Sequence, residues 1–397
     1  MYMVDEIFQW QELDIKLSQA FSPAAAIIRS DFFRGRRTVM RQLVDVVNQD
    51  GQHAIIYGER GVGKTSLANV LSTFLEPFTS ETIASARVNC YRQTTYKEIW
   101  NSLLEQVELL PKHEYNALTL YDVLDTLRSD KERKFILIVD EFDRIEDPDI
   151  DGLFADTIKT LSDFSVDTTL ILVGVADDVN DLITEHESIN RCLVQIHLPR
   201  MTHDELGEIV KGGIESVGME ISEDAIAQTS KLSLGLPHYV HALGLASGRI
   251  AIDNERRAIE LSDVGEAIKT VINESQQTVL RQFDLATASP RRQSYYFQAL
   301  LACALAPTDR LGYFRPADVR IPYSYIMNST QSVSVIARYL HGLCEERRGA
   351  ALQKLGASHS YRYRFTDPVL QPYVLMRGLE HGLLTLEDVD KMTANDR

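Results

Sequence analysis

Cysteine is scarce in this chain of 397 residues, and long apolar runs are missing. The 4 cysteines stand far apart without a CxxC pair, which excludes a disulfide scaffold and predicts free thiols in a reducing compartment rather than metal ligands. No run of about 18 apolar residues occurs, so we expect no membrane span. The acidic start MYMVDEIFQWQELD lacks the order of a signal peptide, and we therefore expect a cytoplasmic protein.

The composition is that of a globular protein, with 25% charged and 44% apolar residues. A disordered chain and a collagen-like repeat are excluded by these fractions. At roughly 100–200 residues per domain, the length predicts two or three domains, each with its own core.

The net charge of −16 is unevenly distributed. Residues 1–280 contain 26 Lys/Arg and 46 Asp/Glu, whereas residues 281–380 contain 13 and 7. The acidic total excludes a chain that coats nucleic acid with its whole surface. The basic segment is where a polyanion would be contacted, although a mixed surface without any partner remains an alternative.

Strand-like and helix-like segments alternate over the first 200 residues, which predicts an α/β fold with a parallel sheet. Two of the strand candidates are continuously apolar, as expected for strands buried on both faces. From Met201 onward, helices follow one another without strands, and a break at 286–292 opens a third segment. The expected strands are 53–57, 83–90, 135–139, 169–175 and 193–198.

The most specific motif is the segment 58–65, GERGVGKT, which fits GxxxxGK[ST]. Glycines let the backbone N–H groups of such a loop turn inward around a phosphate. Lys64 supplies a positive charge to the β- and γ-phosphates, and Thr65 offers a hydroxyl to Mg²⁺. The following helix directs its positive N-terminal end at the same phosphates. We therefore expect ATP with Mg²⁺ at this loop, held by Gly58, Glu59, Arg60, Gly61, Val62, Gly63, Lys64, Thr65 and Ser66.

Adjacent carboxylates close the apolar run FILIVDE at 135–141. Asp140 is placed to hold Mg²⁺ through water, and Glu141 to act as general base toward the attacking water. Acidic residues also close strands for purely structural reasons. The interval between the two motifs has room for an intervening strand and helix, and the Asp-Glu pair favours hydrolysis over passive nucleotide storage.

These motifs resemble those of AAA+ ATPases, in particular the origin-recognition and replication-initiator clade, with features of STAND-type switch ATPases. The resemblance covers about residues 27–397 and implies a P-loop NTPase fold. It further implies ATP hydrolysis by a homo-oligomer. The domains that it implies are an N-terminal extension at 1–30, an ATPase core at 31–200, a helical lid at 201–285 and a winged-helix domain at 286–397.

The resemblance extends the nucleotide site beyond the phosphate loop. Phe33 and Arg36 lie in FRGR, which is similar to a box that lines the adenine pocket. Asn89 matches a polar residue that restrains the catalytic glutamate until a partner engages. Asp177 is nearest to the sensor-1 position, usually Asn, Ser or Thr, and an aspartate donates a hydrogen bond to phosphate only when protonated.

Other positions would act from a neighbouring subunit or from the lid. Arg191 resembles the arginine finger that reaches a neighbour's γ-phosphate, with Arg200 as competitor and a surface ion pair as the structural alternative. Pro237 and His238 resemble the GxP turn of the sensor-2 helix, where many relatives have Arg after the Pro. A neutral His still donates one hydrogen bond, but it can equally be a helix-start residue without a ligand. We expect the acidic segment before Ser22 to pack on a neighbour or partner.

The C-terminal segment has a helical pattern at 332–346 and two alternating runs about the turn ASHS, which predict a hairpin of wing type. If this domain binds duplex DNA, the helix enters the major groove with Arg338, and Lys354, Arg362 and Arg364 meet phosphates. Binding to protein is the alternative. Two functions therefore remain open: a DNA-engaging initiator or loader, and a signalling switch whose oligomer controls a separate effector protein.

Overall fold

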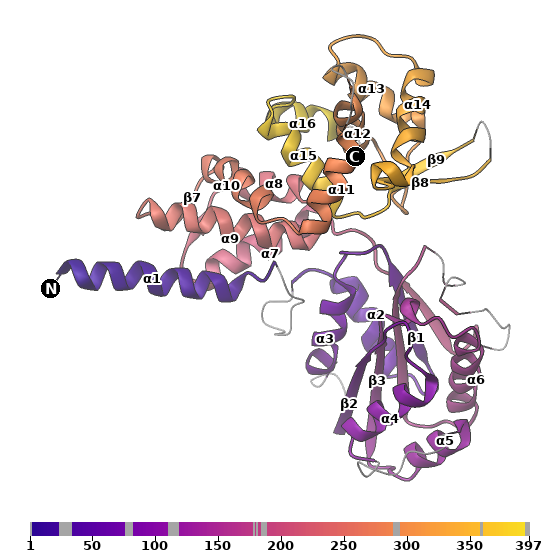
Figure 1. Ribbon diagram of the computed structural model, residues 1–397. Coiled ribbons are helices and arrows are strands. Elements are labelled where there is room, and N and C mark those ends of the chain that lie inside the picture. The colour runs from indigo at the N-terminus through magenta and orange to yellow at the C-terminus, as the bar shows by residue number, and fades with distance from the viewer. Residues whose placement is uncertain are drawn as a thin grey trace. The chain divides into compact units, whose positions relative to one another are not determined.

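The described chain forms two compact units in the computed structural model. Ala25–Met201 form one of them, here called the sheet unit, and Met1–Ala24 together with Thr202–Arg397 form the other, here called the helical unit (Figure 1). The structure describes residues 2–23, 34–75, 82–109, 119–177, 179, 182–183, 189–288, 294–357 and 360–393.

Five strands of the described chain make one parallel sheet in the sheet unit, in the order β2-β3-β4-β1-β5. Strand β4 therefore separates β1, which precedes the phosphate loop, from β3, which ends in the carboxylate pair. The expected α/β fold is confirmed. The strands are β1 (His53–Gly58), β2 (Thr82–Asn89), β3 (Arg133–Asp140), β4 (Thr168–Val175) and β5 (Leu193–His197).

Helices flank this sheet (Figure 1). One face is packed against α4, α5 and α6, where the Trp100 and Phe154 rings stack with centroids 6.4 Å apart. Strands β3 and β4 are buried along nearly their whole length, which explains their unbroken apolar runs. The helices are α2 (Arg37–Val47), α3 (Lys64–Leu75), α4 (Tyr96–Gln106), α5 (Leu120–Arg128) and α6 (Ile150–Asp163), with a 3₁₀ turn η3 (Phe142–Arg144) after β3.

The helical unit continues from Thr202 with amphipathic helices. Side chains of Thr202 and Ser222 cap the starts of α7 and α8, because each accepts a hydrogen bond from the backbone N–H three residues later. The elements are α7 (His203–Ser216), α8 (Glu223–Leu232), α9 (Pro237–Asp253), α10 (Leu261–Asn273) and α11 (Gln277–Thr287), with short paired strands β6 (Glu220–Ile221) and β7 (Ala258–Ile259).

The C-terminal part combines helices with one hairpin. Helices precede an antiparallel hairpin, and Phe314 pairs with Tyr363 along the edge of that hairpin. The elements are α12 (Tyr296–Ala304), α13 (Pro316–Ile326), α14 (Val333–Leu343), η5 (Glu346–Arg348), β8 (Leu352–Leu355), β9 (Arg362–Phe365), α15 (Leu370–Glu380) and α16 (Leu386–Thr393). Nowhere in the described ranges is a helix both long and apolar enough to cross a bilayer.

Contrary to the expectation of a partner-bound N-terminus, α1 (Tyr2–Ala20) packs on α7 and α9 of its own chain. Leu17 and Phe21 are fully buried there. Glycines make room for both side chains: a Cβ at Gly213 would lie 2.5 Å from the Phe21 ring, and one at Gly248 would lie 2.6 Å from Leu17. Helices α7 and α9 thus present a glycine-lined groove to α1.

Filling this groove is expected to loosen α1. Gly244 lies on α9 with a hypothetical Cβ 2.7 Å from Phe21, so Gly244→Val should lower the free energy of unfolding by about 1–3 kcal/mol through overpacking. Gly265→Ala on α10 is the matched control, because its Cβ meets open space and alanine favours a helix. Urea unfolding followed by circular dichroism tests both variants. Equal midpoints for Gly244→Val and the wild type would contradict this packing account.

Candidate nucleotide site

The loop between β1 and α3 is shaped by glycines. Gly58 ends β1 with a φ of 153°, and a Cβ there would collide with the backbone carbonyl of Leu198. Gly61 and Gly63 have φ values of 84° and 96°, which other residues adopt at a cost. The motif therefore requires glycine at these positions for steric reasons that can be read from the backbone.

Lys64, the first residue of α3, is only 8% exposed. Its Nζ donates hydrogen bonds to the carbonyl oxygens of Gly58 at 2.9 Å and Glu59 at 2.7 Å. Burial lowers the pKa of Lys64 to about 8, against the opposing effects of Asp143, Asp140 and Glu59. A nearly buried ammonium bound to loop carbonyls suits an anion that can replace them, so the residues present fit a nucleotide phosphate.

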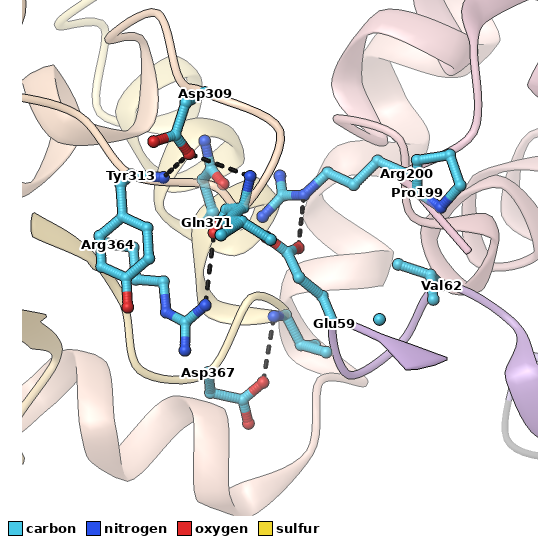
Figure 2. A network of polar contacts seen from close by, with 12 residues as sticks. Glu59, Val62, Pro199, Arg200, Asp309, Tyr313, Arg364, Asp367 and Gln371 are labelled. Atoms are coloured by element: carbon cyan, nitrogen blue, oxygen red, sulfur yellow. Dashed lines mark hydrogen bonds and ion pairs between the residues drawn. The ribbon is translucent and has the colours of Figure 1, made fainter. Parts of the chain in front are cut away.

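Two arginines of the sheet unit hold the phosphate loop in place. Arg36 is 5% exposed, and its Nη2 donates to the carbonyl oxygens of Val62 at 2.9 Å and Pro199 at 2.6 Å. Glu59 pairs with Arg200, with Nε and Oε2 2.8 Å apart (Figure 2). Arg36, implied as a lining residue of an adenine pocket, thus contacts the loop itself, and Arg200 is engaged within the chain.

Asp140 ends β3 and is 2% exposed. One carboxylate oxygen accepts the backbone N–H of Glu141 at 2.8 Å, and the other lies 2.6 Å from Nη2 of Arg87. Arg87 was not singled out by the sequence, where its only signal is its place two residues before Asn89 on the same face of β2. Asp140 and the hydroxyl of Thr65 offer the oxygen ligands that Mg²⁺ prefers.

Glu141 has a left-handed backbone, with φ 57° and ψ 36°. This conformation costs a non-glycine residue about 1–2 kcal/mol, and such strain is concentrated at functional sites. Its Oε2 pairs with Nη1 of Arg144 at 3.0 Å, and the side chain is 39% exposed. The candidate base is therefore held at the start of η3, within reach of solvent.

Asp143 is a further residue that the sequence reasoning missed. Its Oδ1 accepts the backbone N–H of Val175 at 2.7 Å, which joins η3 to the end of β4. It is also the carboxylate that most strongly opposes the lowering of the Lys64 pKa. The available signal was a third acidic residue in the segment DEFD, three positions after Asp140.

The remaining predicted residues of the sheet unit have these places. Asn89 ends β2 and accepts a hydrogen bond from Arg87 at 2.8 Å, so Asn89 and Glu141 contact different arginines. Asp177 follows β4 and is half-buried. Arg191 precedes β5, is 67% exposed and pairs with Asp163 at the end of α6. Phe33 lies outside the described residues.

Pro237 and His238 begin α9 in the helical unit. The ring Nδ1 of His238 donates to the carbonyl oxygen of Pro23 at 2.7 Å, and burial lowers its pKa, so the ring is neutral at pH 7. His241, one turn later, accepts the backbone N–H of Ser22 at 3.3 Å, and burial lowers its pKa to about 4. At the start of α9, both histidines therefore contact the segment that follows α1.

Two of the predicted DNA-contacting residues are well exposed. Arg338 lies on α14 with its guanidinium carbon 5.5 Å from the Tyr339 ring. Lys354 lies on β8 with its Nζ 5.1 Å from the Tyr361 ring. Each cation thus lies beside an aromatic ring and is exposed.

The other two are engaged within the helical unit. Arg362 pairs with Asp309 at 2.9 Å, and Arg364 is half-buried with its guanidinium carbon 4.6 Å from the Tyr313 ring. Asp309 also accepts the backbone N–H groups of Leu311 and Tyr313, which fixes the loop before α13 (Figure 2). Arg362 would have to leave Asp309 to meet a phosphate.

Known proteins with a similar sequence or structure were found for this arrangement. Residues 47–183 match the family model described as an AAA domain. The Walker-type ATPase of Pyrococcus abyssi has 19% sequence identity and a TM-score of 0.52, with 88% of this chain and 98% of that chain covered. The ORC2 protein of Aeropyrum pernix, solved as ADPNP-ADP complexes, has 17% identity and a TM-score of 0.50, with 95% and 98% covered. No curated protein matches the sequence.

The AAA-domain match spans the phosphate loop and the carboxylate pair, and the sheet order and loop geometry are those of a P-loop NTPase. The expected resemblance is confirmed at the level of fold. Residues 47–183 of this chain thus form an AAA domain, and the chain shares its fold with the ORC2 protein of Aeropyrum pernix.

Proposed function

We propose that this protein is an ATPase that uses nucleotide-dependent assembly as a switch and engages duplex DNA through its C-terminal domain. The observation that carries the ATPase proposal is the nearly buried Lys64 ammonium within a glycine-shaped loop. The carboxylates of Asp140 at the end of β3 and Asp143 within η3 lie close enough to act on its charge.

The geometry supports the following roles. Lys64 exchanges its bonds to the loop carbonyls for phosphate oxygens, and the loop N–H groups bind the same anion. Thr65 and Asp140 would hold Mg²⁺, which neutralises charge on the phosphates when bound. Glu141 accepts a proton from the water that attacks the terminal phosphoryl group, and the products are ADP and phosphate.

Substitutions in the two motifs separate binding from chemistry. Lys64→Ala should weaken ATP binding at least about 100-fold, and Glu141→Gln should bind ATP while hydrolysing it about 100-fold more slowly. Calorimetric binding and phosphate release measure the two effects. Glu146→Gln is the control, because Glu146 is exposed and pairs with Arg92 at 2.5 Å. Wild-type hydrolysis by Glu141→Gln would refute the base assignment.

Arg191 is proposed to act in trans. Its ion pair with Asp163 is at the surface, where such pairs contribute about 1 kcal/mol or less, so its exchange for a neighbour's phosphate is inexpensive. This role requires an oligomer in which one chain completes the site of the next.

Mixing two inactive variants tests this arrangement. Arg191→Ala and Lys64→Ala should each hydrolyse ATP slowly, whereas an equal mixture should recover a measurable fraction of the wild-type rate. The recovery arises because some interfaces join an intact loop to an intact Arg191. Arg191→Ala alone should keep its ATP affinity. A mixture no faster than either variant alone argues against catalysis in trans.

The DNA part of the proposal is supported by the excess of Lys/Arg in residues 281–380 and by the exposed Arg338 and Lys354. The likeness to an origin-recognition protein supports the fold only. The second candidate, a switch for a separate effector protein, is favoured by the acidic residues 1–280.

Duplex-DNA binding across a salt series decides between them. The double variant Arg338→Ala with Lys354→Ala should weaken binding about tenfold or more and reduce the salt slope by about 2. Arg320→Ala, an exposed change on α13, should leave binding nearly unchanged. Binding should also differ among ATP, ADP and no nucleotide. If wild-type protein binds no DNA in any nucleotide state, the effector switch becomes the working model.

A further inference from the structure

We propose that Arg87 is a built-in counter-ion of Asp140 with which Mg²⁺ must compete, so that this arginine sets the metal requirement of the site. The inference rests on the proposed nucleotide function. It assigns Arg87 a positioning role, exerted through Asp140, and no contact with the reacting atoms.

Three side chains from different elements meet at the Arg87 guanidinium. Nη2 lies 2.6 Å from Oδ2 of Asp140 on β3 and 2.8 Å from Oδ1 of Asn89 on β2. Nη1 donates to Oδ1 of Asn69 on α3, the helix that starts at the phosphate loop. The arginine therefore joins the Mg²⁺ carboxylate to the restraining residue implied for Glu141 and to the loop helix.

The backbone of Arg87 is fixed as firmly as its side chain. β2 is at the edge of the sheet, and the amide of Gln106 on α4 occupies that edge. It accepts the Arg87 N–H at 3.2 Å and donates to the Arg87 carbonyl oxygen at 3.0 Å. The register pairs Arg87 with Ile138 and Asn89 with Asp140, so the guanidinium reaches a carboxylate two residues further along β3.

Charge explains why an arginine at this place affects a metal ion. A carboxylate that is 2% exposed requires a cationic partner, and Arg87 supplies it. Mg²⁺ brings two further positive charges to the same carboxylate, and like charges at short range disfavour one another. One guanidinium N–H, Nε, is buried without a partner in the described part of the chain. This N–H therefore has no hydrogen bond to lose when the guanidinium moves away from Asp140.

Exchange would have a second effect at Asn89. When Mg²⁺ takes over the charge of Asp140, Arg87 is released from that carboxylate, and its bonds to Asn89 and Asn69 change with it. Metal occupancy is then transmitted to the end of β2 and to α3. Nucleotide bound without metal would leave this cluster in place.

The test is a titration of Mg²⁺ against full-length protein saturated with a non-hydrolysable ATP analogue. Arg87→Gln removes the charge and keeps a hydrogen-bond donor, and Arg87→Met removes both. Both should lower the Mg²⁺ concentration at half-saturation about tenfold, since one neighbouring charge shifts such equilibria by about this factor. Arg87→Lys should stay near the wild-type value. Arg92→Gln is the matched control, because it removes a nearby cation that pairs with Glu146 instead.

Thermal unfolding in MgCl₂ without nucleotide gives a second readout. The stabilisation by Mg²⁺ should be larger in Arg87→Gln than in the wild type, and equal in Arg92→Gln and the wild type. An unchanged or raised Mg²⁺ requirement in Arg87→Gln overturns the inference, even if the variant is less stable. Failure of the wild type to bind the ATP analogue overturns the proposed function instead. The unfolding measurement, made without nucleotide, then still tests whether Arg87 competes with Mg²⁺.

Discussion

The buried positive charge of Lys64 organises the nucleotide site of the sheet unit. The ammonium of Lys64 lies inside a loop whose glycines alone allow the chain to close around it, and its immediate partners are carbonyl oxygens. Burial disfavours that charge, and the carboxylates of Asp143 and Asp140 offset part of the penalty. Each carboxylate needs a donor of its own, which explains the roles of Arg87 and of the Val175 N–H. At this site, each buried charge is therefore offset by a neighbouring group of opposite charge or by a hydrogen-bond donor.

Much of the fold could be predicted because its signals are local. The apolar runs of β3 and β4, the glycine loop and the change to helices after Met201 are all contained in short windows of sequence. The α/β core and its intervening strand followed from them. The same holds for Lys64 and Asp140, whose neighbours in sequence identify them.

The parts that could not be predicted depend on the order of the strands and on helix packing. Arg87 meets Asp140 only because β2 lies beside β3 in one register. Glu59 and Arg200 are 141 positions apart and meet because β5 neighbours β1. Likewise, the groove for Phe21 requires Gly213 and Gly244 from two helices to face the same side. No window of sequence contains these pairs.

The docking of α1 has a consequence for how the chain folds during synthesis. Leu13, Leu17 and Phe21 are synthesised well before the helices that bury them, which begin at His203 and Pro237. The sheet unit is continuous in sequence, so it can fold before α7 and α9 are available to cover the apolar face of α1. A nascent chain that extends past the sheet unit but ends before α9 would therefore expose the apolar face of α1. Such a face is a binding site for chaperones and a starting point for misassembly between neighbouring nascent chains.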